Sequence, residues 1–257
     1  MSSHAPFLIA IAGGSGSGKT TLSRALVARI GEDRCALLDH DSYYRDLSSV
    51  PVAERAGRNF DHPESLENDL LIRHLSALAR GEVVLKPNYD FATHTRRPDA
   101  TPVHPRPIVI AEGILLLSLP NLARCFDLRI FVDAPPDVRA LRRLSRDIVE
   151  RGRTVESVCR QYLTTVRPMH EEFVEPARDS ADLVVSWPDP LRVWVSEVER
   201  AIPPRVLGAR AARQAPLESA QGQTAGKHRP DLGRSAVRQR VSKDGDQTVE
   251  GAEPAAQ

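Results

Sequence analysis

The stretch "AGGSGSGKTT", residues 12–21, decides the fold. Its part from Gly13 to Thr20 fits the pattern G-x-x-x-x-G-K-[ST] in full, between an apolar run at 7–13 and a helical pattern at 19–30. Glycines let successive backbone N–H groups point at phosphate oxygens, and a helix N-terminus adds partial positive charge. A plain Gly/Ser turn is the weaker interpretation in this context. We therefore predict a nucleoside triphosphate site formed by Gly13, Gly14, Ser15, Gly16, Ser17, Gly18, Lys19, Thr20 and Thr21.

Two side chains of this loop and one carboxylate further along predict phosphate and metal chemistry. Lys19 would reach the terminal phosphates, and the Thr20 hydroxyl would ligate Mg²⁺. Glu112 follows the apolar run "PIVIA" within 107–113, and ligands gather at the carboxyl ends of parallel strands. An acid after an apolar strand is common by itself, but beside this loop it predicts that Thr20 and Glu112 organise the metal.

Apolar runs alternate with helical patterns along the chain, which predicts an α/β fold with a parallel sheet. The expected strands cover 7–13, 35–41, 107–113, 128–134 and 181–187. The expected helices cover 19–30, 63–80, 136–150, 154 into the 170s, and 189–202.

The composition narrows the class of protein. Hydrophobic residues make up 41% of the 257 residues and the formal net charge is +1, so the overall charge favours neither nucleic acid nor a membrane surface as a partner. Three widely spaced cysteines favour reduced thiols. No signal-peptide pattern opens the chain, and the longest apolar stretch, 113–120, is far too short to span a bilayer. We expect a cytoplasmic protein.

The C-terminal part differs in composition from the rest. After Trp194 the chain has no aromatic residue, and 204–257 is rich in Ala, Gln, Gly, Arg and Ser without a sustained period. Such a segment buries too little apolar surface to offset its ordering entropy. We expect a folded domain over 1–203 and a disordered tail over 204–257. An electrostatic docking strip at "RSAVRQRVSK" is the less favoured interpretation of that tail.

A cluster of arginines follows the fourth expected strand. Four of them share one side of the expected helix at i, i+3, i+4 and i+7 spacing: Arg139, Arg142, Arg143 and Arg146. Arg151 and Arg153 flank Gly152, a natural hinge. A solvated face balanced by Asp147 and Glu150 is the alternative. Because phosphoryl transfer needs cations around the equatorial oxygens, the triphosphate site favours a basic lid that closes over the phosphates.

Six motifs occur in an order that resembles the uridine kinases (uridine–cytidine kinases), within the wider phosphoribulokinase/uridine kinase group of P-loop proteins. They are "DHDSYYRD" (39–46), "NFDHPES" (59–65), "PNYDFATHTR" (87–96), "AEGILLL" (111–117), "RRLSRDIVERGR" (142–153) and "QYLTTVRPMHEEFVEP" (161–176). The resemblance covers roughly 7–188. It implies the P-loop NTPase α/β fold, with about five parallel strands, a lid at about 139–160 and an acceptor-binding β-hairpin insertion at about 83–106. It also implies ATP or GTP as donor, Mg²⁺, and a homo-oligomer, specifically a tetramer.

The chemistry of the residues on the acceptor side favours the same roles without the resemblance. Transfer to a sugar hydroxyl needs a carboxylate at a rigid strand end, for which Asp41 is the candidate; a turn-capping Asp is the alternative. Asp61, beside Phe60, could bind vicinal ribose hydroxyls or cap the following helix. The cluster of Tyr89, Phe91 and His94 suits a pyrimidine, against a plain hydrophobic hairpin.

The resemblance assigns these and further residues to two sides of the site. On the nucleoside side it places Tyr44, Phe60, Asp61, Tyr89, His94, Arg143, Arg153 and Gln161. On the phosphate side it places Arg146 and Arg151, which would act in catalysis with Lys19 and Asp41. One departure is the segment "SWPDPLRVWVSEV", which lacks the Arg-Gly-Gly-Asn type of turn that lies near the adenine side in bacterial relatives.

We therefore predict a uridine kinase that transfers phosphate from ATP to the 5′-hydroxyl of uridine or cytidine, a reaction of pyrimidine salvage. Two alternatives stay open. The first is another kinase of the same group, which would act on ribulose phosphate or on pantothenate. Ribulose phosphate as acceptor would require extra cations on the acceptor side. A regulatory nucleotide-binding protein is the alternative from another class, although the Asn-Lys-x-Asp motif of guanine switches is absent from the sequence.

Overall fold

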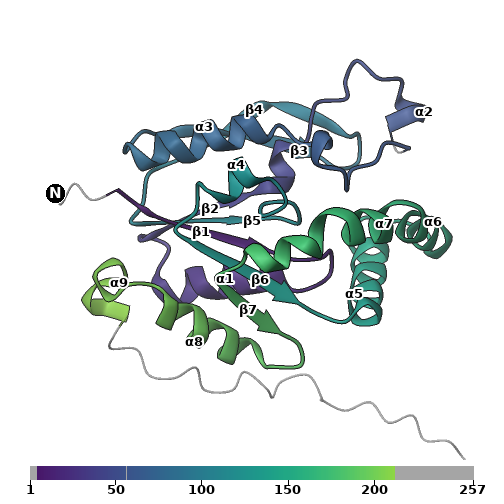
Figure 1. Cartoon of the computed structure of the whole chain (residues 1–257). Coiled ribbons are helices and arrows are strands. Elements are labelled where there is room, and N and C mark those ends of the chain that lie inside the picture. Colours follow the sequence, from purple (N-terminus) through teal and green to yellow (C-terminus); the bar gives the residue numbers. More distant parts are fainter. Residues whose placement is uncertain (1–4, 56, 212–257) are drawn as a thin grey trace, which may run out of the picture. The chain divides into compact units, whose positions relative to one another are not determined.

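The five expected strands pair into one parallel sheet (Figure 1). The computed structural model describes residues 5–55 and 57–211. The strands of the sheet are β1 (Phe7–Ala12), β2 (Cys35–Asp39), β5 (Ile108–Glu112), β6 (Leu128–Asp133) and β7 (Leu183–Ser186). Their order is β2-β5-β1-β6-β7, with every neighbouring pair parallel. Because β1 is central, the glycine-rich loop leaves the middle of the carboxyl edge.

Helices cover the sheet and its carboxyl edge. The α-helices are α1 (Lys19–Ile30), α2 (Val52–Arg55), α3 (Asn68–Ala79), α4 (Pro120–Ala123), α5 (Pro136–Val149), α6 (Val155–Gln161), α7 (Arg167–Met169), α8 (Leu191–Ala201) and α9 (Pro204–Ala211). The 3₁₀ turns are η1 (His40–Tyr43), η2 (Pro63–Ser65) and η5 (Pro176–Ser180), and the π-helical turns are η3 (Tyr162–Val166) and η4 (His170–Val174). Among the described residues, none of these helices has the length and apolar character needed to cross a bilayer.

The sheet separates two apolar cores, which explains why its strands are apolar on both faces. In β1, Leu8 and Ala10 belong to the core under α3, whereas Ile9 and Ile11 belong to the core under α1 and α8. Figure 1 shows α3 on one side of the sheet and α1 and α8 on the other. This packing on both faces holds β1 rigidly, and with it the start of the glycine-rich loop.

The helix expected over 63–80 begins five residues later than predicted. Pro63–Ser65 forms the 3₁₀ turn η2, and α3 proper covers Asn68–Ala79. The reason is a tertiary contact, because Leu66 is extended and forms an isolated antiparallel bridge with Tyr44. Backbone groups of this segment are thereby used by a distant part of the chain, and the helix cannot include them.

A two-stranded antiparallel hairpin stands apart from the main sheet. It consists of β3 (Val84–Asp90) and β4 (Thr95–Val103), within the insertion predicted at about 83–106. Lys86 ties its base to the end of β2, donating a hydrogen bond to Asp39 at 2.6 Å. Arg96 ties its tip to Tyr44, whose carbonyl accepts from the guanidinium at 3.0 Å. The hairpin tip is therefore held over the carboxyl edge of the sheet.

The folded chain continues past the boundary expected at residue 203. Helix α9 begins at Pro204, so the expectation of disorder is wrong for the residues up to 211, while the predicted tail over 212–257 lies outside the described residues. Val206 and Leu207 pack against the core that contains α1 and α8. Arg34 also donates a hydrogen bond to the Val206 carbonyl at 2.7 Å. These contacts between distant segments leave no periodic signal in the sequence.

Truncation after residue 203 should lower the free energy of unfolding, whereas truncation after residue 211 should leave it almost unchanged. Loss of two partly buried apolar side chains costs about 1–2 kcal/mol, or about 2–8 °C in Tm for a domain of this size. Thermal unfolding of both truncated proteins beside the full chain measures the difference. A large loss of Tm on removal of 212–257 would contradict the compositional prediction for that segment.

Candidate active site

The glycine-rich loop is packed so tightly that a side chain at either of two of its glycines would force the neighbouring backbone to shift. Gly13 has φ +138° and a Cβ there would lie 2.3 Å from the Val132 carbonyl oxygen. Gly16 has φ +80° and a Cβ would lie 2.4 Å from the Arg139 carbonyl oxygen. Both φ values fall in the region that L side chains rarely adopt. The loop therefore wraps closely against β6 and α5, which fixes the path of its backbone.

Lys19, the first residue of α1, is buried beneath this loop. Its Nζ donates a hydrogen bond to the Gly14 carbonyl at 2.9 Å. Burial lowers the pKa of Lys19 to about 8, and the nearby carboxylates of Glu112 and Asp41 oppose that shift. The ammonium is thus desolvated and charged below pH 8. Such a cation is stabilised by an anionic ligand more strongly than an exposed lysine would be.

Thr20 and Glu112 meet at the carboxyl edge of the sheet. The Thr20 hydroxyl donates to Glu112 Oε1 at 2.9 Å, although the two residues are far apart in sequence. Burial raises the pKa of Glu112, and the charge of Lys19 opposes that shift. Within residues 5–55 and 57–211, no group of three or more His, Cys, Asp or Glu side chains could hold a cation by itself. The pair nevertheless fits Mg²⁺, which takes one or two carboxylates and completes its shell with phosphate oxygens and water.

Asp41 lies just beyond the end of β2. That strand ends at Asp39, two residues earlier than predicted, and Asp41 belongs to the 3₁₀ turn η1. Its carboxylate acts electrostatically on Lys19, Tyr44 and Glu112, which places it between the phosphate loop and the aromatic residues. A carboxylate in this place can accept a proton from a hydroxyl group brought next to a phosphate.

One cavity of about 600 Å³ brings these groups together with the predicted acceptor side. All the residues predicted for catalysis, nucleoside binding and metal binding line it: Lys19, Thr20, Asp41, Tyr44, Phe60, Asp61, Tyr89, Phe91, His94, Glu112, Arg143, Arg146, Arg151, Arg153 and Gln161. Of the loop residues, Ser15 lines it as well, whereas Gly13, Gly14, Gly16, Ser17, Gly18 and Thr21 do not. A cavity of this size accommodates a small organic molecule beside the phosphate loop.

Aromatic side chains form the wall of the cavity opposite the loop. The Tyr44 ring lies 5.5 Å from Phe60 and 5.4 Å from Tyr89, between ring centroids, and Phe91 packs against Tyr89 at 5.3 Å. His94 stacks on Phe60, with the ring centroids 4.6 Å apart. Flat rings from the hairpin and from the segment before α3 therefore meet in the way that favours planar ligands.

Polar atoms lie within this apolar wall. The Tyr89 hydroxyl is buried and has no hydrogen-bond partner among the described residues. Asp61 is buried too, and burial raises the pKa of its carboxyl group while the charge of Arg143 opposes the shift. Burial lowers the pKa of His94, with Arg153 adding to the effect. A ligand that offers both a flat face and hydroxyl or carbonyl groups would satisfy these atoms.

Some arginines of the cluster contact the glycine-rich loop and others line the cavity. Their spacing in the sequence does not distinguish the two groups. Arg139 is buried, packs on the glycine-rich loop and donates to the Ala134 carbonyl at 3.0 Å. Arg142 donates to the Ser17 carbonyl at 3.3 Å. Neither residue lines the cavity, and both contact the glycine-rich loop instead. Arg143, Arg146, Arg151 and Arg153 do line the cavity.

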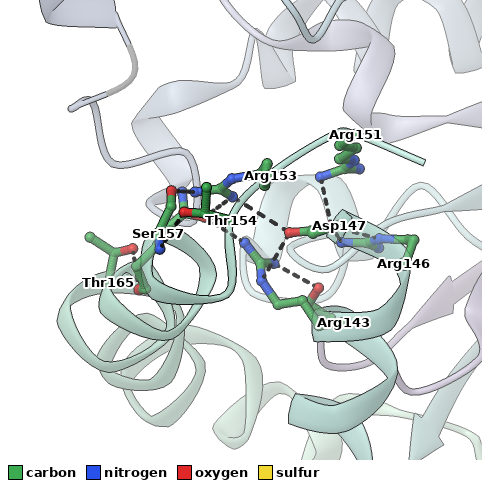
Figure 2. Close-up of polar contacts among 10 residues, drawn as sticks. Arg143, Arg146, Asp147, Arg151, Arg153, Thr154, Ser157 and Thr165 are labelled. Atoms are coloured by element: carbon green, nitrogen blue, oxygen red, sulfur yellow. Dashed lines mark hydrogen bonds and ion pairs between the residues drawn. The ribbon is translucent and has the colours of Figure 1, made fainter. Parts of the chain in front are cut away.

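The residue that connects these four arginines is not singled out by the sequence motifs. Asp147 is fully buried and forms ion pairs with Arg143, Arg146, Arg151 and Arg153, as Figure 2 shows. From the sequence, Asp147 is interpreted only as a charge that balances the arginines on a solvated helix face. Ser157 and Glu150 were also missed and line the cavity. The sequence offers one signal for this residue, since Asp147 comes one residue after Arg146 and four residues before Arg151. Helical spacing alone does not distinguish such a pair from an ordinary surface ion pair.

The parallel sheet, the glycine-rich loop and the basic segment beside it together define a P-loop kinase. A model of the phosphoribulokinase/uridine kinase family matches residues 8–189, so the chain belongs to that family. It is 54% identical over 179 residues to a uridine kinase from Chloroflexus aurantiacus, covering 70% of this chain and 86% of that one. A uridine kinase from Clostridium botulinum is 49% identical over 180 residues, covering 70% and 87%. The structure of phosphoribulokinase from Rhodobacter spheroides matches at 17% identity with a TM-score of 0.54, over 72% of this chain and 71% of that one, which is a likeness of fold.

Proposed function

We propose that this kinase transfers the γ-phosphoryl group of ATP to the 5′-hydroxyl of uridine or cytidine. The observation that carries the proposal is a cavity lined both by Lys19 and Asp41 and by the aromatic wall. The similarity to proteins described as uridine kinases supports the same acceptor. A reaction of this type belongs to pyrimidine salvage.

Each part of the cavity would have a separate task in the transfer. Asp41 would orient the 5′-hydroxyl and accept its proton, and Asp61 would bind the ribose hydroxyls. Tyr89, Phe91 and His94 would hold the base. Lys19, with Arg146 and Arg151, would neutralise the charge on the phosphoryl oxygens, which is the main catalytic task in this chemistry.

A magnesium ion would bind between the nucleotide and the pair Thr20 and Glu112. When bound, Mg²⁺ would supply positive charge that offsets the negative charge of the phosphate groups. The use of GTP in place of ATP and a homotetrameric assembly are further parts of the proposal that rest on the resemblance, and a cytoplasmic location is a further part that rests on the composition. Light scattering on the purified protein measures the assembly directly.

A panel of acceptors tests the proposed function. Purified protein with Mg-ATP should release ADP with uridine and cytidine, and much less with adenosine, guanosine, ribulose 5-phosphate or pantothenate. Parallel assays with GTP establish the donor. Preference for ribulose 5-phosphate or pantothenate would replace the nucleoside by another acceptor of the same family, and ADP release with none of them would favour a nucleotide-binding regulator.

His94→Ala should weaken the choice of pyrimidine over purine nucleosides and leave ATP affinity nearly unchanged. His94 stacks on Phe60 within the aromatic wall, whereas the glycine-rich loop would hold the phosphates. Loss of one buried polar contact to a base corresponds to about ten- to several-hundred-fold in kcat/KM. The comparison is the ratio of kcat/KM for uridine and adenosine in wild type and variant.

His104→Ala is the matched control, because His104 follows β4 of the same hairpin, is exposed and does not line the cavity. The control should behave as the wild type. Unchanged discrimination in His94→Ala would show that this cluster does not read the base.

A further inference from the structure

Asp147 is more deeply buried than any of the four arginines around it. Its side chain is 0% exposed, yet it carries no lining position in the cavity that its partners line. Arg146 donates two hydrogen bonds to its Oδ1, at 2.8 and 2.9 Å. Arg151 lies 3.5 Å from the same oxygen, and Arg153 lies 3.5 Å from Oδ2. Asp147 is therefore buried behind guanidinium groups that line the cavity. Figure 2 shows these groups gathered around its carboxylate.

The partners come from both sides of a turn in the chain. Arg143 and Arg146 lie on α5, whereas Arg151 and Arg153 lie on the segment between α5 and α6. The Asp147 carbonyl also accepts from the Arg153 backbone N–H at 3.1 Å. The carboxylate and the backbone of one residue thus join the end of α5 to the chain that follows it.

The charges around Asp147 do not cancel. Four guanidinium groups face one buried carboxylate, and Gln161, which accepts from Arg143 at 2.9 Å, adds no charge. Without the carboxylate the four cations would repel one another at short range in a partly desolvated place. With it, the four guanidinium groups stay grouped, in a cavity that also holds the carboxylates of Asp41, Asp61, Glu112 and Glu150.

We propose that Asp147 is a positioning residue, which holds Arg146 and Arg151 beside the transferring phosphoryl group and Arg143 and Arg153 beside the nucleoside. This inference rests on the proposed function, since it uses the tasks that the proposal and the resemblance assign to these arginines. Asp147 itself touches neither substrate nor reacting atoms. Its effect on the reaction passes through the orientation of Arg143, Arg146, Arg151 and Arg153.

A positioning role for Asp147 predicts that its substitution affects kcat and ATP affinity differently, which a purely structural ion pair would not. Asp147→Asn keeps the size of the side chain but removes its negative charge, so the cavity becomes more positive while the arginines lose their shared anchor. The affinity for Mg-ATP should therefore stay the same or increase, because ground-state attraction of a polyanion depends on total charge. The kcat should fall by about ten- to a hundred-fold, because transfer depends on donor positions within about 1 Å.

The experiment compares Asp147→Asn and Asp147→Glu with the wild type. Mg-ATP affinity is measured by calorimetry without acceptor, kcat by ADP release at saturating acceptor, and Tm by thermal unfolding. Asp147→Glu keeps the charge and should recover part of the lost kcat. Asp182→Asn is the matched control, because Asp182 pairs with Arg129 at 2.6 Å on the surface, away from the cavity, and should change kcat little.

Several outcomes would overturn the proposal. One is a kcat of Asp147→Asn within a few-fold of wild type in a folded protein, and another is a parallel loss of kcat and Mg-ATP affinity. If Asp147→Asn does not fold, the double variant Asp147→Asn/Arg153→Gln removes one charge of each sign and is compared with Arg153→Gln alone. Equal kcat in those two proteins would contradict a positioning role. Failure of the wild type to phosphorylate uridine would count against the proposed function only, because the same comparison is then made with the acceptor that does release ADP.

Discussion

Asp41→Asn should lower kcat by about 10²–10⁴-fold, the usual contribution of general-base catalysis, while ATP binding survives. The substitution keeps the size and much of the hydrogen bonding of the side chain but removes the proton acceptor. Asp41 lines the cavity between Lys19 and the aromatic wall, whereas the loop that would bind ATP consists of backbone donors and Lys19. Uridine would bind slightly less well, through one weakened hydrogen bond. ADP release gives kcat, and calorimetry gives the ATP affinity.

A carboxylate two residues away provides the control for this experiment. Asp39 accepts from Lys86 and Ser42 and does not line the cavity, so Asp39→Asn should change kcat far less. An Asp41→Asn enzyme that turns over within a few-fold of wild type would overturn the assignment of the base. Asp61, the other buried carboxylate on the acceptor side, would then become the candidate.

Lys19→Ala should reduce both kcat and ATP affinity, which distinguishes it from Asp41→Asn. The variant loses a buried cation that donates to the loop and would contact the terminal phosphates. Removal of one preorganised donor to a developing charge costs about 10²–10³-fold in kcat. Calorimetry with Mg-ATP and ADP release measure the two losses separately.

The pH dependence provides a second readout for the same residue. The pKa of Lys19 in the free enzyme is lowered to about 8, so the ammonium is present below this pH and is lost as the pH rises through it. For the wild type, kcat/KM for ATP should therefore decline above pH 8. In Lys19→Ala that decline should be missing. Full ATP affinity in the alanine variant would show that Lys19 does not contact the nucleotide.

The parts of the fold with strong local signals are the parts that the sequence predicts well. The apolar runs identify every strand of the parallel sheet, because strands buried on both faces carry an unbroken hydrophobic signal. The loop from Gly13 to Thr20 is recognised for a similar reason, since its chemistry depends on residues that are adjacent in the chain. Gly31 ends α1 where the pattern predicts.

Features that depend on distant contacts are less predictable. The start of α3 is set by the bridge between Leu66 and Tyr44, and α9 is held by Arg34, which lies far earlier in the chain. The separate tasks of Arg139 and Arg143 follow from where the loop packs, although both residues fit the same helical spacing. In the candidate site, Asp147 lies within the motif at 142–153, but its task is identified only by its neighbours in space.

The close packing at Gly16 also limits how this chain can evolve. The carbonyl oxygen that excludes a Cβ there belongs to Arg139, on the helix that carries Arg143 and Arg146. A mutation that shifts α5 outward to make room for alanine would carry those guanidinium groups away from the nucleotide at the same time. Substitutions at Gly16 are thereby coupled to residues more than a hundred positions later in the chain.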